Sequence, residues 1–240
     1  MEARPNLFQT VLGAFLLQED TYARMRDDAQ RMKRALVLVV AVGLLVGVTG
    51  ACGRLGEWAV SPPMDKLQST VLSHLSQMPW FTDMSRNPQA MQMFKQQYEL
   101  GWTIAKALVP SPWALVGILT TPLSSLIIWF VYGLLAHLSA RVLGGKGSAG
   151  QTLACTALAV APQLLNIVTV LPFAQAAGVS TWTLVCNFTA VRSAHGLRGW
   201  RALVATVLPL VLAILIGALF ACLGGALAET IIGRTVGGAR

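Results

Sequence analysis

Long stretches without charged residues dominate the pattern of hydrophobic and polar positions along the chain. The longest, residues 147–191, has no Asp, Glu, Lys or Arg over 45 positions. An α-helix rises about 1.5 Å per residue, so roughly twenty apolar residues cross a bilayer core of about 30 Å. The stretch is therefore long enough for two crossings. The segment from Pro172 to Ser180, rich in Pro, Gly and small residues, supplies the turn between them.

Three more uncharged stretches bring the number of predicted membrane-spanning helices to five, which makes the chain an all-α polytopic membrane protein. The second span is longer than one crossing requires, so we expect it to be tilted or kinked at Pro122. Residues 113–223 hold the last four spans. The five predicted spans are residues 35–52, 113–140, 151–172, 179–194 and 202–223.

Residues 1–34 precede the first span and include an apolar stripe at helical spacing within residues 6–18. An amphipathic helix in front of a membrane anchor typically lies along the bilayer surface, and docking onto a partner is the alternative. The stripe consists of Leu7, Phe8, Val11, Leu12, Phe15 and Leu16.

The first loop, residues 53–112, carries two further apolar stripes that predict two amphipathic helices joined near Pro79. Asn87 and Pro88 are the cap and the first residue expected for the second helix. This helical loop is either a lid that rests on the bundle or a Met-rich surface for a partner subunit. Residues 224–240 form a C-terminal tail.

Composition supports lipid as the main solvent of this chain. Its residues are 55% hydrophobic and only 12% charged, and the mean hydropathy is +0.61. Soluble domains carry about 25% charged residues. The net charge of +8 includes no basic run of five, so we expect no nucleic-acid partner. Most of the cations instead flank the predicted spans, where they meet lipid headgroups.

The positions of the cations also predict the orientation of the chain in the membrane. Lys and Arg cluster before the first span and in the second and fourth loops, whereas the third loop has none. Because cytoplasmic loops are enriched in Lys and Arg, the N-terminus is expected in the cytoplasm and the C-terminus outside.

A glycine-rich turn between the second and third spans resembles a phosphate-binding loop but has the wrong spacing. Ala140 occupies the position of the first glycine of such a loop, and Gly147 follows the lysine where Ser or Thr is required. Ser148 and Gln151 instead have the form of a capping box that opens the third span. The turn motif consists of Gly144, Gly145, Lys146, Gly147 and Ser148.

Three amides inside the predicted spans are candidates for interhelical polar contacts: Gln163, Asn166 and Asn187. The alternative function for them is a small-solute permease, with this polar cluster between proline-kinked helices. No Asp, Glu, Lys or Arg stands at the middle of a span, which argues against an ion-coupled transporter.

The sequence offers no catalytic, metal or cofactor site. His137 and His195 each lack a second ligand three or four residues away, and a lone His137 does not support pigment or haem ligation. The four cysteines form no CxxC pair. Paired carboxylates and nucleophile motifs are also absent, so we expect no enzyme activity.

One segment nevertheless resembles a known family. Residues 134–148 end a span in a Gly-Gly-Lys-Gly loop, and the next span contains Ala161-Pro162. Together with residues 191–203 and the Tyr22-Ala23-Arg24-Met25 stretch, this resembles the bacterial branch of the Yip-domain family of five-span membrane proteins.

The resemblance implies no catalytic residues and places the chain in the inner membrane of a bacterium. Eukaryotic relatives bind prenylated small GTPases, partners that a bacterium lacks. We therefore expect a non-enzymatic scaffold or accessory subunit of a membrane complex, or a membrane organiser, that contacts lipid and either other subunits or itself.

Overall fold

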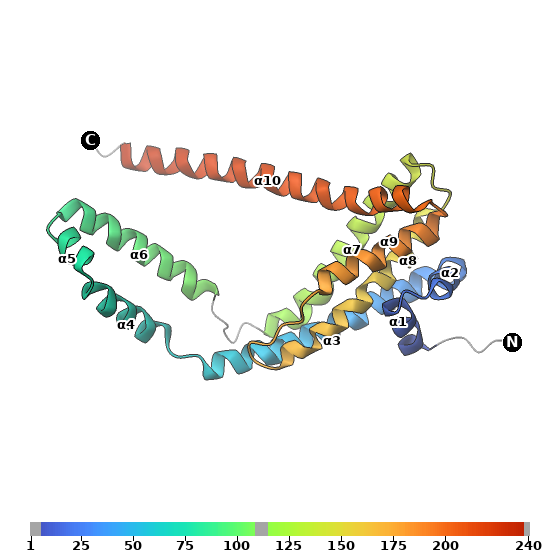
Figure 1. Ribbon diagram of the computed structural model, residues 1–240, viewed down its shortest axis with the longest axis horizontal. Helices are drawn as coiled ribbons and strands as arrows, with labels where there is room; N and C mark the ends of the chain where they lie inside the picture. Colours follow the sequence, from blue (N-terminus) through green and yellow to red (C-terminus); the bar gives the residue numbers. More distant parts are fainter. Residues whose placement is uncertain (1–5, 109–114, 238–240) are drawn as a thin grey trace.

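The computed structural model describes residues 6–108 and 115–237, and the side chains of residues 6–106 and 115–222. The described chain is all-helical (Figure 1). Its helices are α1 (Leu7–Phe15), α2 (Glu19–Asp27), α3 (Arg31–Val60), α4 (Met64–Ser76), α5 (Pro79–Ser85), α6 (Pro88–Leu108), α7 (Gly117–Val142), α8 (Ala149–Ala157), the 3₁₀ helix η2 (Leu158–Val170), α9 (Val179–His195) and α10 (Gly199–Gly237).

Among the described residues, four helical segments are long and apolar enough to cross a membrane. They are α3, α7, the continuous segment formed by α8 and η2, and the described part of α10 up to Cys222. The remaining predicted span, the fourth (residues 179–194), falls on α9, whose 17 residues make it shorter than these four. Five crossings thus stay a prediction, and the start of the second predicted span, residues 113–114, lies outside the described residues.

The helices extend beyond the hydrophobic windows that predicted them. Helix α3 runs from Arg31 to Val60, whereas the predicted span covered residues 35–52. A hydropathy window marks only the apolar part of a helix, and α3 continues through polar turns until Ser61 precedes two prolines. In the same way, α10 continues to Gly237 through most of the predicted tail.

Helix α3 packs against both α7 and α8–η2. Close approach to α7 depends on glycine: a Cβ atom on Gly43 would lie 2.8 Å from Cα of Pro122. Further along α3, a Cβ atom on Gly53 would overlap the carbonyl oxygen of Thr169 in η2. Small residues at helix contacts are typical of membrane bundles, where packing rather than water exclusion drives association.

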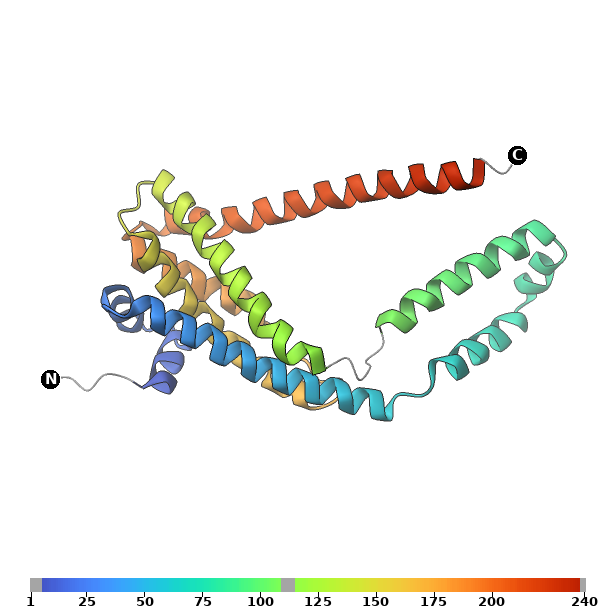
Figure 2. The same ribbon diagram turned by 180° about the vertical axis from the view of Figure 1, so that it is seen from behind.

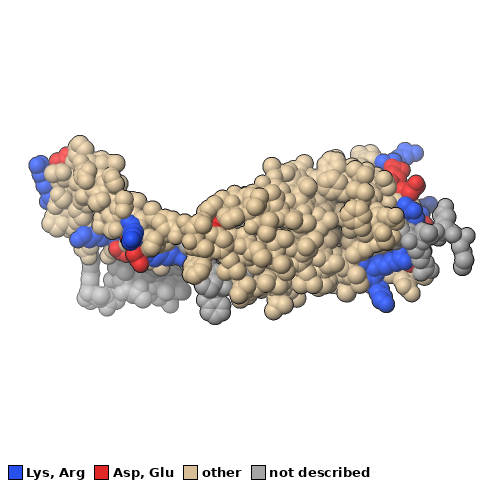
Figure 3. All heavy atoms as spheres, turned by 90° about the horizontal axis from the view of Figure 1, so that it is seen from below, with Lys and Arg blue, Asp and Glu red and all other residues tan. Residues whose placement is uncertain are grey.

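The face of the bundle seen in Figure 3 is apolar between its charged end and helices α4–α6. Large aliphatic side chains of α7 point outward, with Leu119 73% and Ile128 67% exposed. A soluble protein rarely exposes so continuous an apolar surface. This apolar band is therefore consistent with helices that are surrounded by lipid.

Helices α4, α5 and α6 form an arm that projects from one end of the bundle (Figures 1 and 2). Two of them were predicted, and Asn87 caps α6 by accepting hydrogen bonds from the amides of Gln89 and Ala90 (3.0 and 3.2 Å). The short α5 was not predicted. Helices α4 and α6 are joined by a hydrogen bond from the Tyr98 hydroxyl to the Gln68 carbonyl oxygen (2.6 Å).

The N-terminal helices α1 and α2 fold back against the bundle instead of extending away from it (Figure 1). Helix α1 begins with a capping box between Asn6 and Gln9 and lies across η2. The predicted apolar stripe divides: Val11 is buried, whereas Phe8 is 73% and Leu12 46% exposed. Only part of the stripe therefore packs inside the protein, and the role of its outer part stays a prediction.

Candidate functional site

The glycine-rich turn, α2 and the end of α9 meet at one end of the bundle, the end opposite the arm (Figure 2). Backbone hydrogen bonds fix the turn. The Gly145 amide donates to the Ala140 carbonyl oxygen (2.8 Å) and closes the last turn of α7. The Lys146 amide donates to the His195 carbonyl oxygen (3.3 Å), so the turn is also tied to α9. Gly144 has a φ of +89°, which glycine adopts without steric cost.

Gly145 and Gly147 have no room for a side chain because they pack directly on α9. A Cβ atom on Gly145 would lie 2.6 Å from Nδ1 of His195, and one on Gly147 would overlap the Ala194 carbonyl oxygen. Neither glycine has a positive φ, so it is the contact that requires glycine here. The Gly-Gly-Lys-Gly sequence is thus a packing surface for α9.

The hydrogen bonds of His195 determine which of its nitrogens carries the proton. The Gly147 amide donates to Nδ1 (3.2 Å), so in the neutral ring the proton is on Nε2. Nε2 then donates to the Thr152 hydroxyl oxygen at 2.8 Å. Burial, helped by His137 and Arg141, lowers the pKa of His195 to about 4, so this residue at the end of α9 is neutral at pH 7.

A single hydroxyl, that of Thr152, connects three helices. It lies 3.1 Å from Nδ1 of His137 on α7 and 3.0 Å from the Ser148 carbonyl oxygen at the start of α8. The rings of His137 and His195 are 5.2 Å apart, and Thr152 is fully buried. We name His137, Thr152 and His195 the histidine–threonine cluster; it links α7, α8 and α9.

The two histidines had no visible connection in the sequence, and Thr152 was not among the predicted site residues. They are 58 positions apart, and only the packing of α7 against α8 and α9 brings them together. The capping box that was predicted at Ser148 and Gln151 is confirmed, and it places Thr152 in the first turn of α8. The only sign of Thr152 in the sequence was therefore its position in the first helical turn after the predicted cap.

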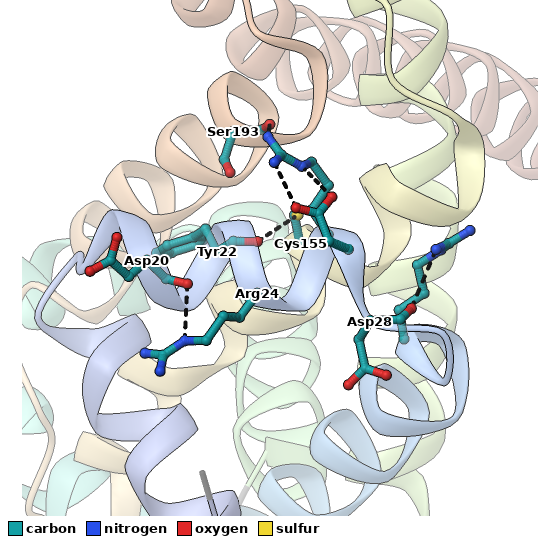
Figure 4. A network of polar contacts seen from close by, with 9 residues as sticks. Asp20, Tyr22, Arg24, Asp28, Cys155 and Ser193 are labelled. Atoms are coloured by element: carbon teal, nitrogen blue, oxygen red, sulfur yellow. Dashed lines mark hydrogen bonds and ion pairs between the residues drawn. The ribbon is translucent and has the colours of Figure 1, made fainter. Parts of the chain in front are cut away.

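Helix α2 closes the same end of the bundle (Figure 4). Its Arg26 donates from Nη1 to the Ser193 carbonyl oxygen of α9 (3.1 Å) and forms a two-pronged pair with Asp27, both contacts at 2.8 Å. These bonds hold the pKa of Asp27 below its usual range. Figure 4 shows Tyr22 and Cys155 between α2 and the bundle; the Cys155 thiol donates to the Tyr22 carbonyl oxygen (3.6 Å).

The Tyr22-Ala23-Arg24-Met25 stretch thus has a structural role. Tyr22 is fully buried, and its hydroxyl donates to the Ala14 carbonyl oxygen of α1 (3.1 Å). Met25 is buried as well. The two side chains, three positions apart on one face of α2, anchor the N-terminal helices on the bundle.

The three predicted amides lie on two helices that pack against each other, η2 and α9. Gln163 and Asn166 lie half-buried on η2, and Asn187 lies half-buried on α9. Within the described part of the chain, no hydrogen bond joins their side chains. Interhelical contact through these amides stays a prediction, and a permease pathway gains no support from them.

The chemistry available at this end of the bundle is mainly that of binding and packing. Over the side chains that the structure describes, no three His, Cys, Asp or Glu residues converge as metal ligands would. In the histidine–threonine cluster, the hydroxyl and the ring nitrogens that face it are already hydrogen-bonded to one another or to the backbone. The arrangement stabilises a helix junction.

Removal of the Thr152 hydroxyl tests the cluster. Thr152→Val keeps the shape but leaves two histidines without their partner, so we expect the free energy of unfolding to fall by about 1–3 kcal/mol. Thermal unfolding of the detergent-solubilised protein measures the loss. Thr156→Val is the control, because its hydroxyl bonds only to carbonyl oxygens one turn back in its own helix. Equal losses for the two variants would contradict a special role for Thr152.

When the chain is compared with known protein families, one family model covers the region that contains these features. The model described as the Yip1 domain matches residues 12–221. The matched region includes α2, the glycine-rich turn and the histidine–threonine cluster. No curated protein and no solved structure matches the chain.

Proposed function

Because the chain belongs to the Yip1 domain family, a family of membrane proteins, we propose that it serves as a non-enzymatic scaffold or accessory subunit in a membrane complex. The observation that carries this proposal is that side chains of potentially reactive types form hydrogen bonds between helices. His137, Thr152, His195 and Arg26 are all engaged in holding helices together. Such a site positions helices for contact with lipid or with other subunits.

The proposed topology has five spans, with α9 as the fourth, the N-terminus in the bacterial cytoplasm and the C-terminus outside. The two ends of α9 support a crossing. Its last residue is bonded to the turn between α7 and α8, whereas the segment before α9 is bonded to the far end of α3, where the Phe173 amide donates to Glu57 (2.8 Å). The connection from Phe173 and α9 together thus run between opposite ends of the bundle, whereas α9 itself begins beside α1, where Trp182 Nε1 donates to the Phe15 carbonyl oxygen (2.9 Å).

Cysteine accessibility tests the topology. In a background without the four native cysteines, Ser73→Cys on the arm should react with a membrane-impermeant maleimide in intact cells. Arg198→Cys, in the turn between α9 and α10, should react only after the cells are opened. Both side chains are exposed, so access to them depends on the side of the membrane. Labelling of Arg198→Cys in intact cells would mean that α9 does not cross.

Purification from native membranes tests the scaffold role. We expect mass spectrometry of the gently solubilised protein to detect stable partner subunits or a second copy. Gly147→Ala, which disturbs the helix junction, should reduce their recovery, whereas Gly150→Ala should not. A wild-type protein that purifies alone as a monomer would contradict the accessory-subunit proposal.

A further inference from the structure

A pocket of about 280 Å³ opens between α1, α2 and the start of α3, at the boundary between the charged end and the apolar band. Of its lining side chains Met25 and Leu38 are buried, and the others are exposed or half-buried. Leu7, Met25, Val37 and Leu38 supply the apolar side chains. Thr10, Gln30, Lys33 and Arg34 supply the polar ones.

The order of these residues along α3 places charge and apolar surface one helical turn apart. Lys33 is followed four positions later by Val37, and Arg34 by Leu38, so each pair shares a face of the helix. Four residues rise about 6 Å along the axis. A phospholipid has the same order of groups, a charged phosphate followed by the apolar start of its chains.

The charge in the pocket lining favours an anionic ligand. Arg34 is already paired with Asp28 (2.8 Å). In the part of the chain that the structure describes, no ion pair includes the exposed Lys33. The pocket lining thus combines one cation outside these ion pairs with apolar side chains of the same helix.

The surroundings of the pocket favour a lipid over a soluble anion. Phe8 and Leu12 on α1 and Leu36 on α3 are exposed apolar side chains on the two helices that flank the opening. At about 280 Å³ the pocket is slightly smaller than typical small-molecule sites of about 300–1,000 Å³, so it has room for a headgroup and the first chain carbons but not for whole acyl chains. On these grounds we propose that it binds the headgroup and first chain carbons of an anionic phospholipid, with Lys33 at the phosphate and Val37 beside the chains.

Native mass spectrometry of the delipidated full-length protein tests the proposal, with phosphatidylglycerol and phosphatidylcholine of the same chain length as probes. We expect preferential retention of phosphatidylglycerol. Lys33→Gln should lower its retention about fivefold, the effect of one cation near an anionic headgroup. The control Arg198→Gln removes a positive charge at the same end, away from the pocket, and should leave retention unchanged.

A second pair of variants tests the apolar part of the pocket. Val37→Trp should fill it and abolish the preference, whereas Leu36→Trp, at a neighbouring exposed position outside the pocket lining, should not. Millimolar inorganic phosphate should not displace the lipid. Equal retention of the two lipids, equal effects of Lys33→Gln and Arg198→Gln, or displacement by phosphate alone would each overturn the proposal.

Discussion

Gly147→Ala should destabilise the bundle by about 2–6 kcal/mol. The added methyl group would overlap the Ala194 carbonyl oxygen, and overpacking of this kind typically costs about 1–3 kcal/mol. Moving the turn away also removes the hydrogen bond to Nδ1 of buried His195, which adds about 1–3 kcal/mol. Thermal unfolding in detergent, followed by circular dichroism, measures the change.

Gly150→Ala is the matched control for this variant. It lies three residues further along, where a Cβ atom would meet only the Arg31 Nε atom at 3.6 Å, an ordinary contact. Alanine is the better helix former, so this change should leave stability unchanged or raise it by up to about 1 kcal/mol. If both variants unfolded at the same temperature as the wild type, the packing of the turn on α9 would be refuted.

Gly53→Ala should produce the second large effect, at the opposite end of α3. Its Cβ atom would overlap the Thr169 carbonyl oxygen, so α3 and η2 must separate, at a cost of about 1–3 kcal/mol. In membrane bundles close contact of backbones contributes much of the association, so the loss should also appear as faster proteolysis of the folded protein.

Gly50→Ala provides the comparison within the same helix. A Cβ atom at Gly50 would lie 3.7 Å from Nη2 of Arg54 and 3.8 Å from the Thr169 hydroxyl, so it fits without movement. The two substitutions make the same chemical change one turn apart. A loss of stability at Gly50 equal to that at Gly53 would indicate that glycine flexibility, and not helix contact, is what matters in α3.

Features of the chain that depend on local sequence could be predicted. Uncharged stretches located α3, α7, α8–η2 and α10, and the Ser148–Gln151 capping box is confirmed in the structure. Asn87 caps α6 as its position before Pro88 predicted. Each of these depends on residues within one or two helical turns, where spacing alone indicates which groups meet.

Features that depend on packing between distant segments could not be predicted. His137 and His195 gave no metal or cofactor signal along the sequence, yet they share Thr152 as a hydrogen-bond partner. The stripe on α1 indicated a helix but not which of its apolar residues face η2 and which face outward. Seven-residue α5 is too short to show a periodic pattern.

Over the side chains that the structure describes, helix α10 is joined to the bundle near its start. Tyr132 donates to the Thr206 carbonyl oxygen (3.1 Å), and Ala202 and Ala205 are buried, but every side chain described from Leu210 to Cys222 is exposed. Among the side chains described, none of α10 beyond Pro209 therefore contributes to the interior of the bundle. During synthesis, α3 to α9 can pack while this last segment is still being made, so a nascent chain that stops after Pro209 should already hold the histidine–threonine cluster together.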